Sequence, residues 1–275
     1  MAGSGTMELG LRGKTAIVTG ASRGIGLAIA RALHREGVAL AIVARRHETL
    51  HAAATTIAND RGAPELSQGA TVHPIVADLG VRAEVERVVA QAIARLGHVD
   101  ILVNNAGQSR SDTFFDMPEE AFEGIWQTKA FGYVRMVAAV APHMRERQLG
   151  SIINIIGTAA RTPTEDFIVG SMVNAALLNF TRGVARILAR DHVRINAISP
   201  GWTLTEGQLR HFEMQAAARG ESLDDLMQRE ARAIPLRRLV TMDEIAEMAL
   251  LLASDRMSAM TGEDVIIDGG ATPSI

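Results

Sequence analysis

The stretch TAIVTGASRGIGLAIARAL, residues 15–33, decides the fold of this chain. An apolar run leads into a turn that carries Gly20, Gly24 and Gly26, and apolar residues with helical spacing follow. Glycine lets a backbone turn tightly and approach a ligand, and the first amides of a helix attract negative charge. A strand, a glycine turn and a helix in this order are typical of a site for a dinucleotide pyrophosphate. The alternative is a turn that only packs helix on strand.

The rest of the chain repeats this alternation of short Val- and Ile-rich runs with longer helical segments. Such alternation predicts a parallel sheet buried on both faces. We expect a Rossmann-like, doubly wound α/β fold of seven strands in the order 3-2-1-4-5-6-7, with helices on both faces. The expected strands are Thr15–Thr19, Leu40–Val43, Thr71–Ala77, Ile101–Asn104, Ser151–Ile156, Arg194–Ile198 and Asp264–Ile267. The expected helix starts are Gly24, Glu48, Arg82, Glu119, Asp166 and Met242, the last with a capping box of Thr241 and Glu244.

The length of 275 residues suits one large α/β domain. We expect a flexible N-terminus at residues 1–10 and a single nucleotide-binding domain over residues 11–275. The polar stretch Glu206–Arg232 interrupts the alternation after the sixth predicted strand. It predicts a helical excursion over the site, or else a solvated pair of helices.

Composition narrows the kinds of partner. The net charge of −3 supplies no basic field for nucleic acid or an anionic membrane, so we expect a small-molecule substrate. The chain has no cysteine, and no His, Asp or Glu cluster has the spacing of metal ligands, so we expect no disulfide, thiolate nucleophile or metal. Neither a signal peptide nor a membrane-spanning run is evident, which predicts a cytoplasmic protein.

Further motifs follow the predicted strands in order. They are Asp78-Leu79, the NNAG sequence at residues 104–107, PGWTLT at 200–205 and DGG at 268–270. With the Gly-x-x-x-Gly-x-Gly turn, they resemble the short-chain dehydrogenase/reductase family over residues 11–270. In that family these motifs contact the adenine, the ribose and nicotinamide, and the carboxamide of the cofactor. The resemblance, with the charges discussed next, assigns cofactor contacts to Gly20, Ser22, Arg23, Gly24, Ile25, Gly26, Arg45, Asp78, Leu79, Asn105, Ala106, Gly107, Asn174, Pro200, Gly201, Thr203 and Thr205.

Charge at the end of the second predicted strand favours NADP(H) over NAD(H). An acid usually meets the ribose 2′-hydroxyl there, whereas a 2′-phosphate needs cations. This sequence has Ala44 at that position, followed by Arg45 and Arg46, and Arg23 lies in the glycine turn. Two guanidinium groups, Arg23 and Arg45, can converge on one phosphate, while Arg46 can remain solvated.

The catalytic positions implied by the resemblance carry unusual residues. The family uses a serine, a tyrosine thirteen positions later and a lysine four positions after that, because an adjacent ammonium makes the phenol a usable acid. Alignment of the segment around Asn174 places Gly157 at the serine, Gly170 at the tyrosine and Asn174 at the lysine position.

Sliding the register by one residue recovers the hydroxyls of Thr158 and Ser171, but Ala175 then stands at the lysine position. Neither register therefore provides a phenol and ammonium pair.

Lys129 stands where the family usually has an asparagine, and Asn174 stands where the family has its lysine. The two residue types have therefore exchanged positions. Lys129 is our candidate general acid or electrostatic clamp, and Asn174 our candidate for holding the ribose. The alternatives for Lys129 are an ammonium that reaches solvent or one paired with Glu165 or Asp166. Tyr133, on the same helical face, is either a displaced acid or an aromatic residue in a subunit interface.

Several functions fit these residues. The first is an NADP(H)-dependent oxidoreductase that acts on a carbonyl or an alcohol through an altered proton relay, because the cofactor itself carries the hydride. The second is a non-catalytic NADP(H) sensor or structural protein, and the third is a non-redox enzyme, such as a lyase or isomerase, that reuses the fold.

We also expect a homodimer or homotetramer. The resemblance implies it, and the predicted helices Glu119–Arg147 and Asp166–Arg190 carry more apolar residues than one sheet face should need. These apolar residues include Trp126, Phe131, Leu177 and Phe180.

Overall fold

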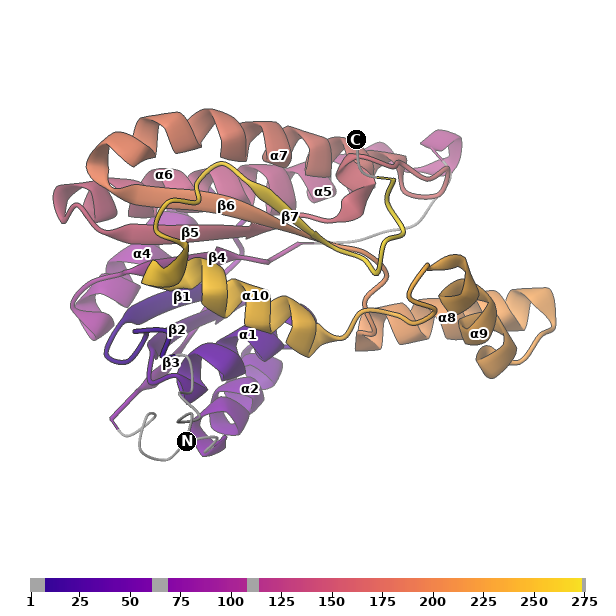
Figure 1. Cartoon of the computed structure of the whole chain (residues 1–275), viewed down its shortest axis with the longest axis horizontal. Helices are drawn as coiled ribbons and strands as arrows, with labels where there is room; N and C mark the ends of the chain where they lie inside the picture. The colour runs from indigo at the N-terminus through magenta and orange to yellow at the C-terminus, as the bar shows by residue number, and fades with distance from the viewer. Residues whose placement is uncertain (1–7, 61–68, 108–113, 274–275) are drawn as a thin grey trace, which may run out of the picture.

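The computed structural model describes residues 8–60, 69–107 and 114–273. Its strands form one parallel sheet in the order β3-β2-β1-β4-β5-β6-β7 (Figure 1), which confirms the predicted fold class. The strands are β1 Thr15–Thr19, β2 Ala39–Ala44, β3 Val72–Val76, β4 Ile101–Asn104, β5 Gly150–Ile155, β6 Val193–Pro200 and β7 Asp264–Ile267. The predicted bounds of β1, β4 and β7 are confirmed, and those of the other strands were wrong by one or two residues, because pairing with a neighbour sets where a strand ends.

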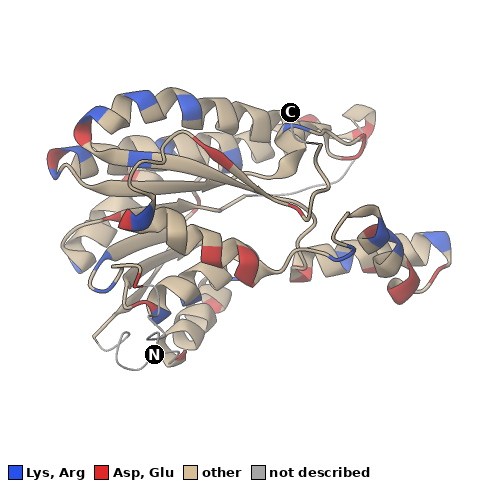
Figure 2. Ribbon diagram, in the orientation of Figure 1, with Lys and Arg blue, Asp and Glu red and all other residues tan. Residues whose placement is uncertain are grey.

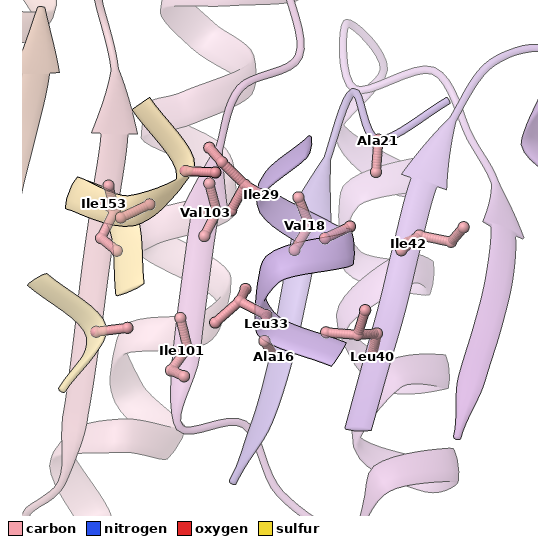
Figure 3. Packing of buried hydrophobic residues seen from close by; sticks show 14 of the residues in the cluster. Ala16, Val18, Ala21, Ile29, Leu33, Leu40, Ile42, Ile101, Val103 and Ile153 are labelled. Carbon is pink, nitrogen blue, oxygen red and sulfur yellow. The ribbon is translucent and has the colours of Figure 1, made fainter. Parts of the chain in front are cut away.

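Helices cover both faces of this sheet. Alternate residues of each strand point to opposite faces, so Ala16 and Val18 pack toward one helical layer and Ile17 toward the other. The first layer consists of α1, α2 and α10, and Figure 3 shows Ile29 and Leu33 of α1 lying over the strands. The second consists of α4, α6 and α7. These helices span α1 Gly24–Arg35, α2 His47–Asn59, α4 Arg82–Leu96, α6 Gly132–Glu146, α7 Ile168–Leu188 and α10 Met242–Ala253.

Two predicted helix starts were slightly wrong. The helix expected at Glu48 begins at His47, and the one expected at Asp166 begins at Ile168, after Phe167 in a non-helical conformation. The other predicted starts are confirmed, as is the capping box of α10, in which the Thr241 hydroxyl accepts from the Glu244 amide at 3.3 Å. Along the ribbon of Figure 2, positions of basic residues (blue) and acidic residues (red) are interspersed over the outer helices.

The predicted long helix Glu119–Arg147 is wrong. The segment forms α5 (Glu119–Ile125), a π-helical turn (Trp126–Phe131) and α6. A π-turn adds one residue to each hydrogen-bonded ring, which changes the direction of the side chains that follow, and such turns are frequent at functional sites. Lys129 lies within this π-turn.

The prediction that these helices expose an apolar surface for an oligomer is also mostly wrong. Leu177 is 1% exposed in a core cluster of its own chain, and Trp126 and Phe180 pack against that cluster. Phe131 is exposed. Tyr133 does not lie in a subunit interface: it is 1% exposed within the same cluster, because α6 turns it toward its own sheet. The homo-oligomer remains a prediction that rests on the resemblance.

The excursion between β6 and α10 contains two helices, α8 (Glu206–Arg219) and α9 (Leu223–Ala233), which stand away from the sheet in Figure 1. Each has a side-chain cap, from Thr205 and Ser222 respectively. The pair is held by a small core that includes Phe212 and Leu226. Among the described residues, no helix has both the length and the apolar character needed to cross a membrane.

Candidate functional site

The turn between β1 and α1 is fastened to the turn after β4. The Thr19 hydroxyl accepts from the backbone amides of Asn105 at 2.9 Å and Ala106 at 3.1 Å, and the Asn105 side-chain amide donates to the carbonyl of Gly20 at 3.2 Å. A Cβ on Gly20 would lie 2.8 Å from Ala106 Cα, so only glycine fits. The two motifs therefore form one rigid floor.

The glycines of the turn have different roles. A Cβ on Gly26 would lie 2.5 Å from the carbonyl oxygen of Gly20, so Gly26 allows α1 to pack closely on the turn. Gly24 has a φ of +59°, and the nearest atom to a Cβ added there is in a Thr205 methyl group at 3.9 Å, so this position has open space around it. The first turn of α1 has no side-chain cap and no acid. Its amides are therefore directed toward a place where an anion can bind.

A cleft of about 410 Å³ opens above this floor. Its lining includes these predicted cofactor residues: Gly20, Ser22, Arg23, Gly24, Ile25, Arg45, Leu79, Asn105, Ala106, Gly107 and Thr205. It also includes residues to which the sequence analysis assigned no cofactor contact: Val43, Ala44, Arg46, Thr49, Ala77, Thr128, Glu206 and Gly207. Ala44 and Arg46 were considered there only for their charge. Val43 lies in β2 and Ala77 directly follows β3, positions that could have suggested both. No local signal indicated Thr128, which lies in the π-turn.

Other predicted cofactor residues lie outside the lining of this cleft: Gly26, Asp78, Asn174, Pro200, Gly201 and Thr203. The Asp78 carboxylate accepts from the Gly80 amide at 2.9 Å, so it closes its own turn. The Thr203 hydroxyl donates to the Gly201 carbonyl at 3.0 Å, and a Cβ on Gly201 would lie 2.6 Å from Asp268 Cβ. The segment after β6 thus packs against the segment that follows β7.

The charge of the cleft is mainly positive. Of the lining residues that the structure describes, Arg23, Arg45 and Arg46 are basic and Glu206 alone is acidic. β2 ends at Ala44, so no carboxylate stands at the strand end where it would repel a phosphate. Among the described residues, no group of three or more His, Asp and Glu side chains could hold a metal ion.

The structure brings Lys129 and Asn174 together, immediately behind the floor of the cleft. The Lys129 ammonium donates to the Asn174 side-chain oxygen at 2.6 Å and to the Ile156 carbonyl at 2.8 Å. A Cβ on Gly107, which lines the cleft, would lie 3.2 Å from Lys129 Cδ. Burial lowers the pKa of Lys129 to about 8, because desolvation disfavours the charged ammonium.

The predicted alternatives for Lys129 and Tyr133 can now be compared with the structure. Pairing of Lys129 with Glu165 or Asp166 is wrong: neither carboxylate is a partner of Lys129, and Asp166 accepts instead from the Thr164 hydroxyl at 2.8 Å. The Tyr133 hydroxyl donates to the Ile155 carbonyl at 2.9 Å, and burial raises its pKa far above the ordinary value. A phenol in this state is a poor proton donor at neutral pH.

The two glycines at the predicted serine and tyrosine positions are both structurally required. Gly157 has a φ of +127°, and a Cβ there would lie 3.1 Å from the side-chain nitrogen of Asn174. Gly170 is buried in α7, and a Cβ there would lie 2.1 Å from Phe167 Cζ, because the aromatic ring rests directly on the glycine. An aromatic ring thus covers Gly170, and Lys129 supplies a cation close to Gly157.

Comparison with known proteins assigns a family to this geometry. The family model described as enoyl-(acyl carrier protein) reductase matches residues 20–272. The uncharacterized oxidoreductase YvrD of Bacillus subtilis (strain 168) is 32% identical, with 98% of this chain and 100% of YvrD covered.

Two solved structures share the arrangement. L-sorbose reductase from Gluconobacter frateurii, complexed with NADPH and L-sorbose, has a TM-score of 0.90 at 30% identity, covering 98% of this chain and 100% of that one. An NAD⁺-bound xylitol dehydrogenase has a TM-score of 0.86 at 28% identity, covering 95% and 100%. Similar folds therefore bind either nicotinamide dinucleotide.

Proposed function

Because the chain belongs to the short-chain dehydrogenase/reductase family, we propose that it is an NADP(H)-dependent oxidoreductase that reduces a carbonyl compound or oxidises the corresponding alcohol. The observation that carries the proposal is the cleft over the uncapped start of α1. Three features of this turn fit a pyrophosphate. The first amides of α1 have no side-chain cap, there is open space at Gly24, and only glycine fits at residue 20. When bound, the dinucleotide supplies the hydride.

The cationic side of the cleft supports NADP(H) over NAD(H). Arg23 comes from the glycine turn and Arg45 directly follows β2, so the two residues line the cleft from separate segments. Guanidinium groups bind phosphate through paired hydrogen bonds, and no acid stands at the end of β2 to bind a ribose 2′-hydroxyl.

The proton relay of the proposed reaction runs through Lys129. The ammonium is held by Asn174 and the Ile156 carbonyl, and its pKa of about 8 leaves it mostly protonated at neutral pH but able to release a proton. In reduction, Nζ gives its proton to the carbonyl oxygen as the carbon receives the hydride. Solvent then reprotonates the amine. Asn174 has a positioning role in this scheme, because it orients Nζ, and its proposed contact with the ribose remains a prediction.

The proposed function is tested by following absorbance of the reduced nicotinamide with a panel of carbonyl compounds. We expect oxidation of NADPH with some members of the panel and very slow turnover of simple ketones, because the altered acid lacks the phenol of the family. Fluorescence titration of NADPH onto the same preparation measures binding separately. Tight binding without turnover of any carbonyl would instead support a non-catalytic nucleotide-binding protein, and rapid reduction of common ketones would contradict the altered relay.

Cofactor preference gives a second prediction. Replacing Arg45 or Arg23 with alanine should lower the preference for NADPH over NADH, because a charge-assisted contact contributes about 1.5–3 kcal/mol, or roughly 10-fold or more in affinity. Affinity for NADH should change little. The matched control is Arg186→Ala, on the exposed outer side of α7. Equal affinity of the unaltered protein for the two cofactors would contradict the assignment.

A further inference from the structure

The ammonium of Lys129 has a donor to spare. A lysine side chain offers three N–H donors. Two of them have acceptors, the Ile156 carbonyl and the Asn174 amide oxygen, at 2.8 and 2.6 Å. Among the residues that the structure describes, no third acceptor contacts Nζ. Both partners are neutral oxygens, so they orient the cation without neutralising it.

No carboxylate compensates this charge within the described part of the chain. The ion pairs formed there do not include Lys129, and the lowered pKa of Lys129 has desolvation as its cause. A cation that is partly withdrawn from water without an anion costs stability, and a perturbed group of this kind is a candidate for binding a ligand of opposite charge. Lys14 provides the contrast: it forms an ordinary surface pair with Asp255 at 3.0 Å.

The surroundings of Lys129 leave little else to recognise a substrate. Gly107 and Gly157 bring backbone rather than side chains to this place, and Asn174 is already bonded to the ammonium. At the start of α7, the Phe167 ring covers Gly170 with an apolar surface. The ammonium is therefore a polar group with which the described residues could recognise a substrate here.

We propose that the natural substrate carries a carboxylate next to its reacting carbonyl, as in a 2-oxo acid and the corresponding 2-hydroxy acid, and that Lys129 Nζ binds it. This inference rests on the proposed function and specifies its substrate class.

Lys129 Nζ has only one N–H without an acceptor among the described residues, and this explains why the carboxylate and the carbonyl of the substrate must be adjacent. In a 2-oxo acid, the carbonyl oxygen and one carboxylate oxygen can lie on the same side, so one N–H faces both of them. A distant carboxylate would occupy the donor and leave the carbonyl oxygen without an acid. In reduction the carbon gains a hydride from NADPH, the carbonyl oxygen gains the Lys129 proton, and the carboxylate keeps its charge. The product is the 2-hydroxy acid, and NADP⁺ is the oxidised partner.

Binding of two substrate analogues of similar shape, one charged and one neutral, tests whether the substrate's charge is recognised. Oxamate has the shape of a small 2-oxo acid, and oxamide is its neutral counterpart. Calorimetric titration of the full chain with each probe, with and without NADP⁺, should show oxamate binding at least about 10-fold tighter than oxamide, as expected for a charge-assisted contact in a partly buried place. Lys129→Met should remove that difference, while Lys14→Met should keep it. Equal binding of the two probes, or equal loss in both variants, would overturn the proposal.

A spectroscopic readout distinguishes a bound anion from a general change in packing. Lys14 and Lys129 are the lysines of this sequence, so selective ¹³C-lysine labelling gives readily assigned Cε signals. The Lys129 signal should titrate near pH 8, and oxamate should move that titration to higher pH, because an adjacent anion stabilises the ammonium. A titration unchanged by oxamate would contradict binding at Nζ.

The assay panel then separates this inference from the function on which it rests. If NADPH binds and 2-oxo acids are reduced faster than their methyl esters, both the oxidoreductase proposal and the proposed substrate class are supported. If NADPH binds and the neutral esters or simple ketones react equally well, the substrate class is wrong and the oxidoreductase proposal stands. If NADPH does not bind at all, the proposed function itself fails.

Discussion

Replacing Lys129 with methionine is expected to lower the turnover number by about 10²–10⁴-fold while changing NADP(H) affinity by no more than a few fold, because loss of an oriented acid has an effect of that size. Methionine keeps the length and apolar contacts of the lysine stem, which lies against Gly107, but has no proton to give. Turnover is measured with a responsive carbonyl substrate, and cofactor affinity by fluorescence titration. Unchanged melting of the variant would show that the fold is intact.

The pH dependence of this reaction provides an internal check. A lysine whose pKa is lowered to about 8 is an ammonium at neutral pH and loses its proton as the pH rises through that value. For reduction, kcat/KM should therefore be level below about pH 8 and fall above it. Alcohol oxidation needs the free amine as base, so its kcat/KM should rise over the same range. Lys129→Met should show neither step in its residual activity.

A second variant, Tyr133→Phe, tests whether the Tyr133 hydroxyl, one helical turn after Lys129, is the acid instead. Tyr133→Phe removes the hydrogen bond to the Ile155 carbonyl but leaves Lys129 in place. We expect it to lose some stability and to keep the pH profile of the unaltered protein. Full activity of Lys129→Met would refute the relay, and a loss of the pH step in Tyr133→Phe would move the acid to Tyr133.

Restoring a tyrosine at residue 170 is expected to destabilise the protein rather than activate it. Any side chain there must displace Phe167, whose ring atom Cζ lies 2.1 Å from the position of an added Cβ. Overpacking of this kind costs about 1–3 kcal/mol even for small additions, and a tyrosine adds far more volume than a methyl group. Asn174 also supplies no ammonium to lower the pKa of the new phenol. Denaturant unfolding should therefore show a large loss of stability for Gly170→Tyr.

The same helix offers a matched control. Gly183 is exposed on α7, and no atom lies within 4 Å of a Cβ added there. Gly183→Ala should stabilise the chain by about 0.5–1 kcal/mol, the ordinary gain of alanine over glycine in a helix. Gly170→Ala should change stability in the opposite direction. Removing the ring in Phe167→Ala/Gly170→Tyr should recover part of the loss. Equal effects of alanine at residues 170 and 183 would show that the ring does not restrict this position.

The comparisons with known proteins agree with the predicted fold and glycine turn. The proton relay through Lys129 and the substrate remain predictions that need experiments. The matched relatives are named oxidoreductases, reductases or dehydrogenases, and the similar structures include complexes with NADPH and with NAD⁺. The proposed preference for NADP(H) therefore rests on Arg23 and Arg45 of this chain.

The sequence by itself determined the sheet and the glycine turn. The short apolar run at Thr15–Thr19, all of it buried, and the glycines at residues 20, 24 and 26 are local properties of the sequence. A strand buried on both faces and a tight turn of the backbone can be recognised without knowledge of distant segments. The same holds for the capping box at Thr241, whose partners are three residues apart. Strand ends were less well determined, because they depend on the neighbouring strand.

Only the tertiary structure decided which side chains meet behind the cleft. Lys129 and Asn174 are 45 residues apart, and their contact depends on the π-turn and on the packing of α7 against it. The ring of Phe167 over Gly170 and the burial of Leu177 also depend on how α7 packs rather than on its own periodicity. Periodicity shows that a residue faces a neighbour, but side-chain volume and backbone direction select the neighbour, and these belong to segments far apart in the chain.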